Sequence, residues 1–148
     1  MNALKTTLAS LTLVAITLSA AAHAESKPEA LISLPYADLK WQVVPNTNGA
    51  VTYANTDEDI FGNGDYSAFV TFKAGTDNGL HTHSKSLPTV VLKGTFYAVI
   101  DKVRTEFPAG SYYKLPANRV HESGCTAEAD CLLFQYQSDK YDLVPAKS

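Results

Sequence analysis

Three histidines in the second half of the chain have the residue type and the spacing of metal ligands. His81 and His83 form a His-x-His pair, and His121 follows further along. Side chains at positions i and i+2 of a β-strand point to the same face, so both imidazoles of the pair can reach one ion. Neutral imidazoles suit several divalent transition metals and do not choose among them. The sequence therefore predicts one metal ion, Zn, Fe or Ni, held by these three residues.

The fourth histidine of the chain, His23, lies in a segment that has the pattern of a secretory signal. Lys5 precedes an apolar stretch at residues 8–22, and Ala22-His23-Ala24 is a small-x-small cleavage site. The apolar stretch is shorter than the roughly 20 residues that a membrane span requires. We predict a cleaved signal peptide at residues 1–24 and a periplasmic or secreted protein with no membrane segment. No histidine then remains outside the three candidate ligands; the alternative is that these are ordinary polar residues of a half-buried sheet.

The rest of the composition is that of one small acidic domain. The formal net charge is −3, and the chain has no basic stripe, which leaves no electrostatic basis for binding nucleic acid. The chain is long enough for one domain with a core and too short for two. Cys125 and Cys131 are the two cysteines, and a disulfide between them is the expectation in an oxidising compartment. A free Cys125 thiol near the metal is the alternative.

Short β-strands must position these side chains. Residues 25–35 are polar and irregular and are expected to form a flexible N-terminal segment, and residues 36–40 have the pattern of a short turn of helix. Many short strands at spacings near ten residues, separated by Gly and Pro turns, are typical of a β-sandwich or barrel. The strands are expected at residues 41–44, 50–53, 66–73, 89–92, 95–101, 112–115 and 132–137.

The residues around the His-x-His pair resemble the first motif of the cupin superfamily. Gly75 and five further residues precede His81-Thr82-His83, and Gly94 closes the motif. The family's glutamate position is Leu87 here, so the usual carboxylate ligand is missing.

The residues around His121 resemble the second cupin motif. Gly110 leads to Pro116, and Asn118 stands where the family has a glycine. Asparagine tolerates the left-handed backbone conformation better than most residues, so this substitution is mild.

The C-terminal third is similar to a narrower, uncharacterised bacterial group of single-domain cupins, related to the cupin part of ChrR-type anti-sigma factors. The similarity rests on Pro116-Ala117, Cys125, Cys131-Leu132-Leu133-Phe134 and Lys140-Tyr141-Asp142. Members of this group commonly lack the motif glutamate. The resemblance implies an all-β cupin-type barrel, a double-stranded β-helix or jelly roll, as a single domain over residues 36–145.

Three histidines without a carboxylate predict a metal with an open coordination position. Strand alternation turns Glu122 away from the face of His121, whereas Ser123, Cys125 or Thr89 could approach the ion; water is the favoured occupant. A structural zinc site usually has four protein ligands, while a catalytic site leaves one position free. Four residues are candidates for the lining of a cavity beside the ion: Thr89, Tyr97, Tyr113 and Gln135. For each of them, simple packing is the alternative.

Three functional interpretations follow. The first is a metal-dependent enzyme that acts on a small-molecule substrate by oxygenase, isomerase or hydrolytic chemistry; three-histidine cupins include iron dioxygenases, which is an analogy of fold. The second is a ligand-binding or redox-sensing module without catalysis, in which Cys125 would be oxidised. The third is a structural metal domain with a filled barrel. Cupins often pair, so a homodimer is a candidate assembly.

Overall fold

The computed structural model describes residues 30–147, which form short β-strands and one turn of 3-10 helix at Tyr36–Asp38. The predicted signal peptide and residues 25–29 of the segment 25–35 lie outside the described residues. Within the described part, no helix has the length and apolar character to cross a membrane. The strands are β1 (Gln42–Val43), β2 (Val51–Asn55), β3 (Tyr66–Phe72), β4 (His81–Thr82), β5 (Leu87–Lys93), β6 (Thr95–Ile100), β7 (Val103–Pro108), β8 (Tyr112–Leu115), β9 (Glu122–Cys125), β10 (Cys131–Gln137) and β11 (Val144–Pro145).

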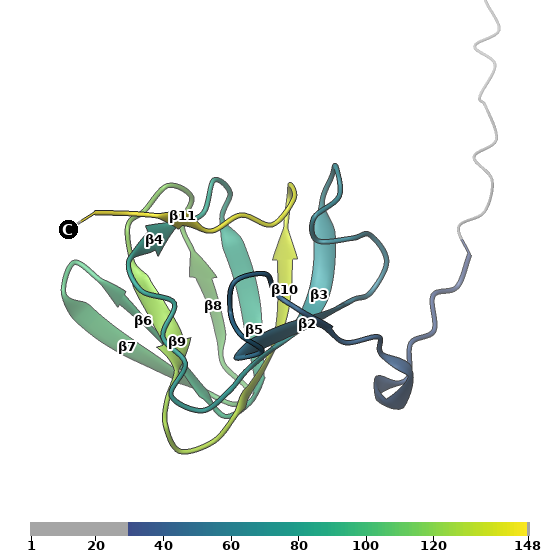
Figure 1. Cartoon of the computed structure of the whole chain (residues 1–148), viewed down its shortest axis with the longest axis horizontal. Helices are drawn as coiled ribbons and strands as arrows, with labels where there is room; N and C mark the ends of the chain where they lie inside the picture. The colour runs from purple at the N-terminus through teal and green to yellow at the C-terminus, as the bar shows by residue number, and fades with distance from the viewer. Residues whose placement is uncertain (1–29, 148) are drawn as a thin grey trace, which may run out of the picture. The chain divides into compact units, whose positions relative to one another are not determined.

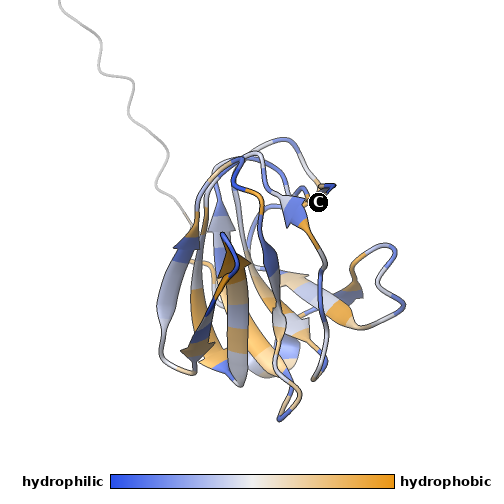
Figure 2. Cartoon of the chain, turned by 90° about the vertical axis from the view of Figure 1, so that its left-hand side faces the viewer, coloured by the Kyte–Doolittle hydropathy of each residue, from blue (hydrophilic) through white to orange (hydrophobic). Residues whose placement is uncertain are grey.

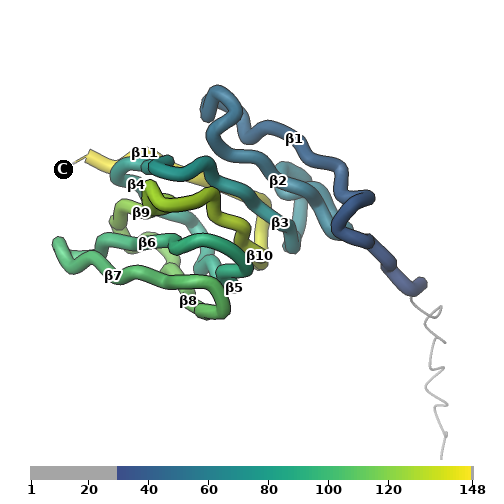
Figure 3. The backbone as a smooth tube through the Cα atoms, turned by 90° about the horizontal axis from the view of Figure 1, so that it is seen from below, coloured from purple at the N-terminus to yellow at the C-terminus, as the bar shows by residue number. Residues whose placement is uncertain are grey.

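Antiparallel sheets enclose the interior of the domain (Figure 1). The largest sheet has the strand order β1-β2-β3-β10-β5-β8, a second has the order β7-β6-β9, and β4 pairs with β11. Seen from below, the strands from β4 to β11 wind around a common interior, and the β1–β2 hairpin lies to one side (Figure 3). The predicted all-β architecture is confirmed.

The alternation of residue types along the strands decides which side chains enter this interior. Buried residues alternate with less buried ones along β3 and β10. The two strands pair over their whole length, with Leu133 opposite Val70, and β5 pairs with the other side of β10. Because paired residues point to the same face of a sheet, the buried side chains form one continuous inner surface. Hydrophobic residues accordingly gather in the strands, while the loops are more hydrophilic (Figure 2).

Each strand expected from the sequence is present, with ends shifted by one or two residues. Four strands lie outside the expected ranges, and the first of them, β4, has only two residues. β7 is exposed along almost its whole length, so its sequence lacks the alternation that marks a half-buried strand. β9 is short and contains Gly124, and β11 has only two residues.

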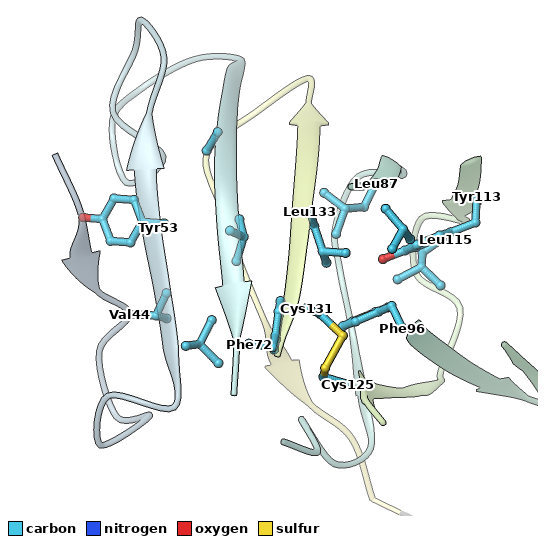
Figure 4. Close-up of a cluster of buried hydrophobic side chains, with 14 of the residues drawn as sticks. Val44, Tyr53, Phe72, Leu87, Phe96, Tyr113, Leu115, Cys125, Cys131 and Leu133 are labelled. Atoms are coloured by element: carbon cyan, nitrogen blue, oxygen red, sulfur yellow. A yellow bond between two sulfur atoms is a disulfide. The ribbon is translucent and has the colours of Figure 1, made fainter. Parts of the chain in front are cut away.

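The predicted disulfide between Cys125 and Cys131 joins two sheets. Cys125 belongs to β9 and Cys131 to β10, with their Cα atoms 5.8 Å apart. Both residues are about 1% exposed. The bond lies among buried side chains, near Phe72 and Phe96 (Figure 4). It therefore fastens the smaller sheet to the larger one inside the core.

Removal of this bond should destabilise the fold by about 2 kcal/mol, the loss that the chain-entropy account gives for so short a loop. We expect the double variant Cys125→Ala/Cys131→Ala to lose this amount in urea unfolding under oxidising conditions. Reduction of the wild-type protein with dithiothreitol should produce a similar loss without any substitution. A urea midpoint that neither treatment changes would contradict the stabilising role of the bond.

Candidate metal centre

The three predicted ligands meet at one buried point. Their imidazole rings have centroid separations of 4.3 Å (His81–His121), 5.0 Å (His81–His83) and 5.4 Å (His83–His121). One ligand atom from each residue lies within 4.8 Å of the other two. The residues are only 1%, 4% and 1% exposed, for His81, His83 and His121. These separations place all three rings within reach of a single ion.

Backbone hydrogen bonds join the two histidine segments. The N–H of His81 donates to the carbonyl of His121 at 2.9 Å, and the N–H of His121 donates to the carbonyl of His81 at 3.0 Å. The N–H of Asn118 donates to the carbonyl of His83 at 2.8 Å. Asn118 has a φ of 57°, the left-handed conformation predicted for the residue at the motif's glycine position. The turn before His121 is therefore bonded to His83, and His121 itself is bonded to His81.

Backbone carbonyls also fix the tautomer of each ring. Each Nδ1 lies at hydrogen-bond distance from a carbonyl oxygen, which can only accept, so Nδ1 carries the proton and Nε2 keeps its lone pair. The acceptors are Gly79 for His81 at 2.7 Å, Asp142 for His83 at 2.5 Å and Arg119 for His121 at 2.8 Å. The Nε2 atoms of His81 and His121 are buried without any hydrogen-bond partner. Because buried polar atoms normally have partners, two orphaned acceptors beside each other fit a bound cation.

Burial favours the neutral forms of His81 and His83. It lowers the pKa of His81 to about 4, and it also lowers the pKa of His83. The neutral imidazole is the form that binds a metal. These two ligands are therefore ready to bind a cation at neutral pH without first losing protons.

The C-terminal segment holds His83 in place. The backbone carbonyl of Asp142 faces the His83 ring, and the Asp142 carboxylate accepts hydrogen bonds from the N–H of Ser84 at 3.0 and 3.1 Å. The side-chain amide of Gln137 donates to the same carboxylate at 3.3 Å and accepts from the Tyr66 hydroxyl at 3.0 Å. This chain of contacts anchors the segment that supplies the partner of His83.

A cavity of about 720 Å³ extends into the barrel from His83. This volume is typical of sites for small molecules. Leu87, at the position of the missing glutamate, is 2% exposed and forms part of the wall. Figure 4 shows Leu87 close to Leu115 and Tyr113 in the interior. An apolar side chain thus replaces the carboxylate next to the histidines.

The four candidate lining residues lie in different surroundings. Tyr113 and Gln135 line the cavity, and Thr89 lies between them on β5, almost fully buried. Tyr97 does not line it. Alternation along β6 directs Phe96 into the cavity and turns Tyr97 to the other face, where the Arg104 guanidinium lies 3.7 Å from its ring centroid.

The candidates for a fourth ligand do not join the histidines. Among residues 30–147, the cluster contains no carboxylate or thiolate. Cys125 is bonded to Cys131, and the Ser123 hydroxyl accepts a hydrogen bond from Asn78 at 3.1 Å at the cavity wall. In this part of the chain, the three imidazoles are therefore the only charged or imidazole ligands that the protein supplies to the cluster.

The sequence model of a family described as the ChrR Cupin-like domain matches residues 31–140. No curated protein matches the chain. KdgF from Halomonas sp. has a similar structure, with 16% identity, a TM-score of 0.59, and coverage of 73% of this chain and 93% of that one. The polyketide cyclase RemF from Streptomyces resistomycificus has 12% identity, a TM-score of 0.68 and coverage of 80% and 87%. A cupin-2 domain from Rhodospirillum rubrum has 11% identity, a TM-score of 0.62 and coverage of 78% and 80%. At these identities the solved structures show a shared fold.

The lowered pKa values predict that the metal-free protein loses stability in acid. In the folded state His81 stays neutral down to about pH 4, whereas in the unfolded chain it takes up a proton near pH 6.5. Its contribution to stability is therefore complete above about pH 6.5 and is lost as the pH falls towards 4. We expect the urea midpoint of the metal-free protein to fall across this range.

Carboxylates titrate in the same range, so the variant His81→Gln provides the control. Its midpoint should fall less steeply between pH 6.5 and pH 4 than that of the wild-type protein. Equal slopes for the two proteins would contradict the assignment to His81.

Leu87→Glu should restore a fourth protein ligand and tighten metal binding by about tenfold, the size of one good additional charged contact. Chelator competition would measure the metal dissociation constant of each protein. Leu87→Gln is the matched neutral control and should not tighten binding to the same extent. Equal affinities of Leu87→Glu and wild type would mean that residue 87 does not face the ion.

Proposed function

Because the chain belongs to the ChrR cupin-like family, we propose that it is a metal-dependent cupin that acts on a small molecule. His81, His83 and His121 hold one divalent transition metal, Zn, Fe or Ni, and leave at least one coordination position open to water. The observation that carries this proposal is the pair of buried Nε2 atoms without partners in the cluster of three histidines.

The metal, when bound, would polarise an oxygen of the substrate or activate water as a Lewis acid. The chain contributes three uncharged ligands and an adjoining cavity that reaches His83. This combination suits an oxygenase, an isomerase or a hydrolytic step on a molecule that enters beside the ion. The polyketide cyclase RemF has a similar fold, which supports small-molecule chemistry by analogy of fold alone.

Two structural features argue against a redox sensor and against a purely structural metal domain. A redox sensor that works through Cys125 needs a reactive thiol, whereas Cys125 is bonded to Cys131 in the core. A purely structural metal domain would have a filled interior, whereas a cavity of about 720 Å³ adjoins His83. A binding module without catalysis shares the same open metal site and differs only in turnover.

We also propose that the chain works outside the cytoplasm, in the periplasm or as a secreted protein. The buried disulfide supports this location, because such bonds persist in oxidising compartments. The predicted export signal at residues 1–24 is outside the described residues.

Loss of one ligand tests the metal site. We expect His81→Ala and His121→Ala each to lower metal affinity by at least about tenfold, since even loss of a ligand's supporting partner costs this much. Elemental analysis after dialysis against limiting metal would measure metal per chain. Thr82→Ala is the matched control, because Thr82 lies between His81 and His83 but is not part of the cluster. Unchanged metal content in both histidine variants would refute the site.

A further inference from the structure

Three polar side chains form a row across the inner face of the larger sheet. Gln135 on β10 is opposite Thr89 on β5, and Thr89 is opposite Tyr113 on β8. Their exposures are 6%, 1% and 6% in that order. Residues paired in this way on neighbouring strands have adjacent side chains. We call these three residues the polar row.

The polar row has unused hydrogen-bonding capacity. The Tyr113 hydroxyl is buried beside the side chains of Thr89 and Gln135, but it makes no hydrogen bond of normal geometry, although such a group normally has one. Gln135 shares the cavity wall with Tyr113. A hydroxyl and an amide together offer both donors and acceptors, so the polar row could bind a neutral polar group of a ligand.

The polar row is offset along its strands from the residues near His83. Gln135 precedes Gln137 by two residues, and Gln137 belongs to the network that anchors the partner of His83. Thr89 likewise follows Leu87, the residue at the glutamate position, by two residues. Two residues of a strand span about 7 Å. A ligand that extends from the His83 end of the cavity to the polar row would fit with a body about as long as one aromatic ring.

The surroundings of that body are apolar and carry no positive charge. Among the described residues that line the cavity, none is Lys or Arg, and the charged ones are the carboxylates Asp77 and Asp142. Phe96 stacks on the Tyr113 ring at a centroid distance of 5.8 Å and an angle of 4°. A negative group buried here without a cation partner would be strongly disfavoured, whereas a flat apolar ring would be accommodated.

From these contacts we propose that the cavity takes a ligand with three parts: an oxygen donor on the metal, a flat uncharged body, and a neutral hydrogen-bonding group that meets Tyr113 and Gln135. Phenols and related hydroxylated aromatic molecules have this chemistry. The inference rests on the proposed function, because the oxygen donor needs the metal and its open position.

A series of ligands with one metal-binding group tests this proposal. Benzohydroxamate, 4-hydroxybenzohydroxamate and 4-carboxybenzohydroxamate would be titrated into the cobalt-loaded protein, whose visible absorption reports changes of coordination. We expect the 4-hydroxy compound to bind about fivefold more tightly than the parent, the gain from one net hydrogen bond. The 4-carboxy compound should bind at least roughly tenfold more weakly than the 4-hydroxy compound.

Variants of the polar row test whether Tyr113 and Gln135 cause the tighter binding of the 4-hydroxy compound. Tyr113→Phe and, independently, Gln135→Leu should remove the advantage of the 4-hydroxy group, so that the 4-hydroxy compound and the parent compound bind each variant with equal affinity. Tyr112→Phe is the matched control, because Tyr112 is the neighbouring residue of β8 and is 64% exposed. It should behave as wild type.

The outcomes separate this inference from the proposed function. If benzohydroxamate does not alter the cobalt spectrum, the open metal position is refuted, and the ligand proposal is refuted with it. If the parent binds but the three compounds have equal affinities, or if Tyr113→Phe and Gln135→Leu both keep the difference, the ligand proposal alone is overturned.

Discussion

The paired hydrogen bonds between the backbones of His81 and His121 are the constraint on which the site depends. Each residue donates to the other's carbonyl, at 2.9 and 3.0 Å, so two segments far apart in sequence become directly opposed. The contact between Asn118 and the His83 carbonyl extends this attachment to the remaining ligand. The backbone pairing therefore brings the imidazole rings close together, and the side-chain rotamers only orient them towards one point.

A second feature is the conflict between burial and unused polar atoms. Three imidazoles nearly without solvent contact would be costly in a core unless their nitrogens were bonded. Carbonyl oxygens satisfy the Nδ1 side, and the Nε2 atoms of His81 and His121 are left over at the centre. Leu87 adds no charge there, so an ion would keep more of its positive charge than it does beside a glutamate. Such an ion is a stronger Lewis acid towards whatever enters the cavity.

The sequence predicted the parts of this site that depend on local spacing. The His-x-His pair, His121 and Asn118 occupy motif positions, and most strands have a recognisable alternation. The Nδ1 partners could not be predicted, because any residue can supply a backbone carbonyl and the role of Asp142 depends on a contact distant in sequence. Tyr97 is a candidate for the cavity lining from its sequence because the strand can be recognised. The sequence does not show which face of that strand lies inside. β7 was missed since an exposed strand has no apolar face to detect.

The attachment of His83 to Asp142 also orders events during synthesis. A chain emerging from the ribosome contains all three histidines before residue 142 appears, so the ring of His83 lacks its carbonyl partner until Asp142 has been added. The finished coordination geometry therefore requires the chain as far as Asp142, and metal loading in that geometry follows its arrival. A truncation or a bulky fusion just after Asp142 would disturb the surroundings of the ion, even though all three histidine ligands would still be present.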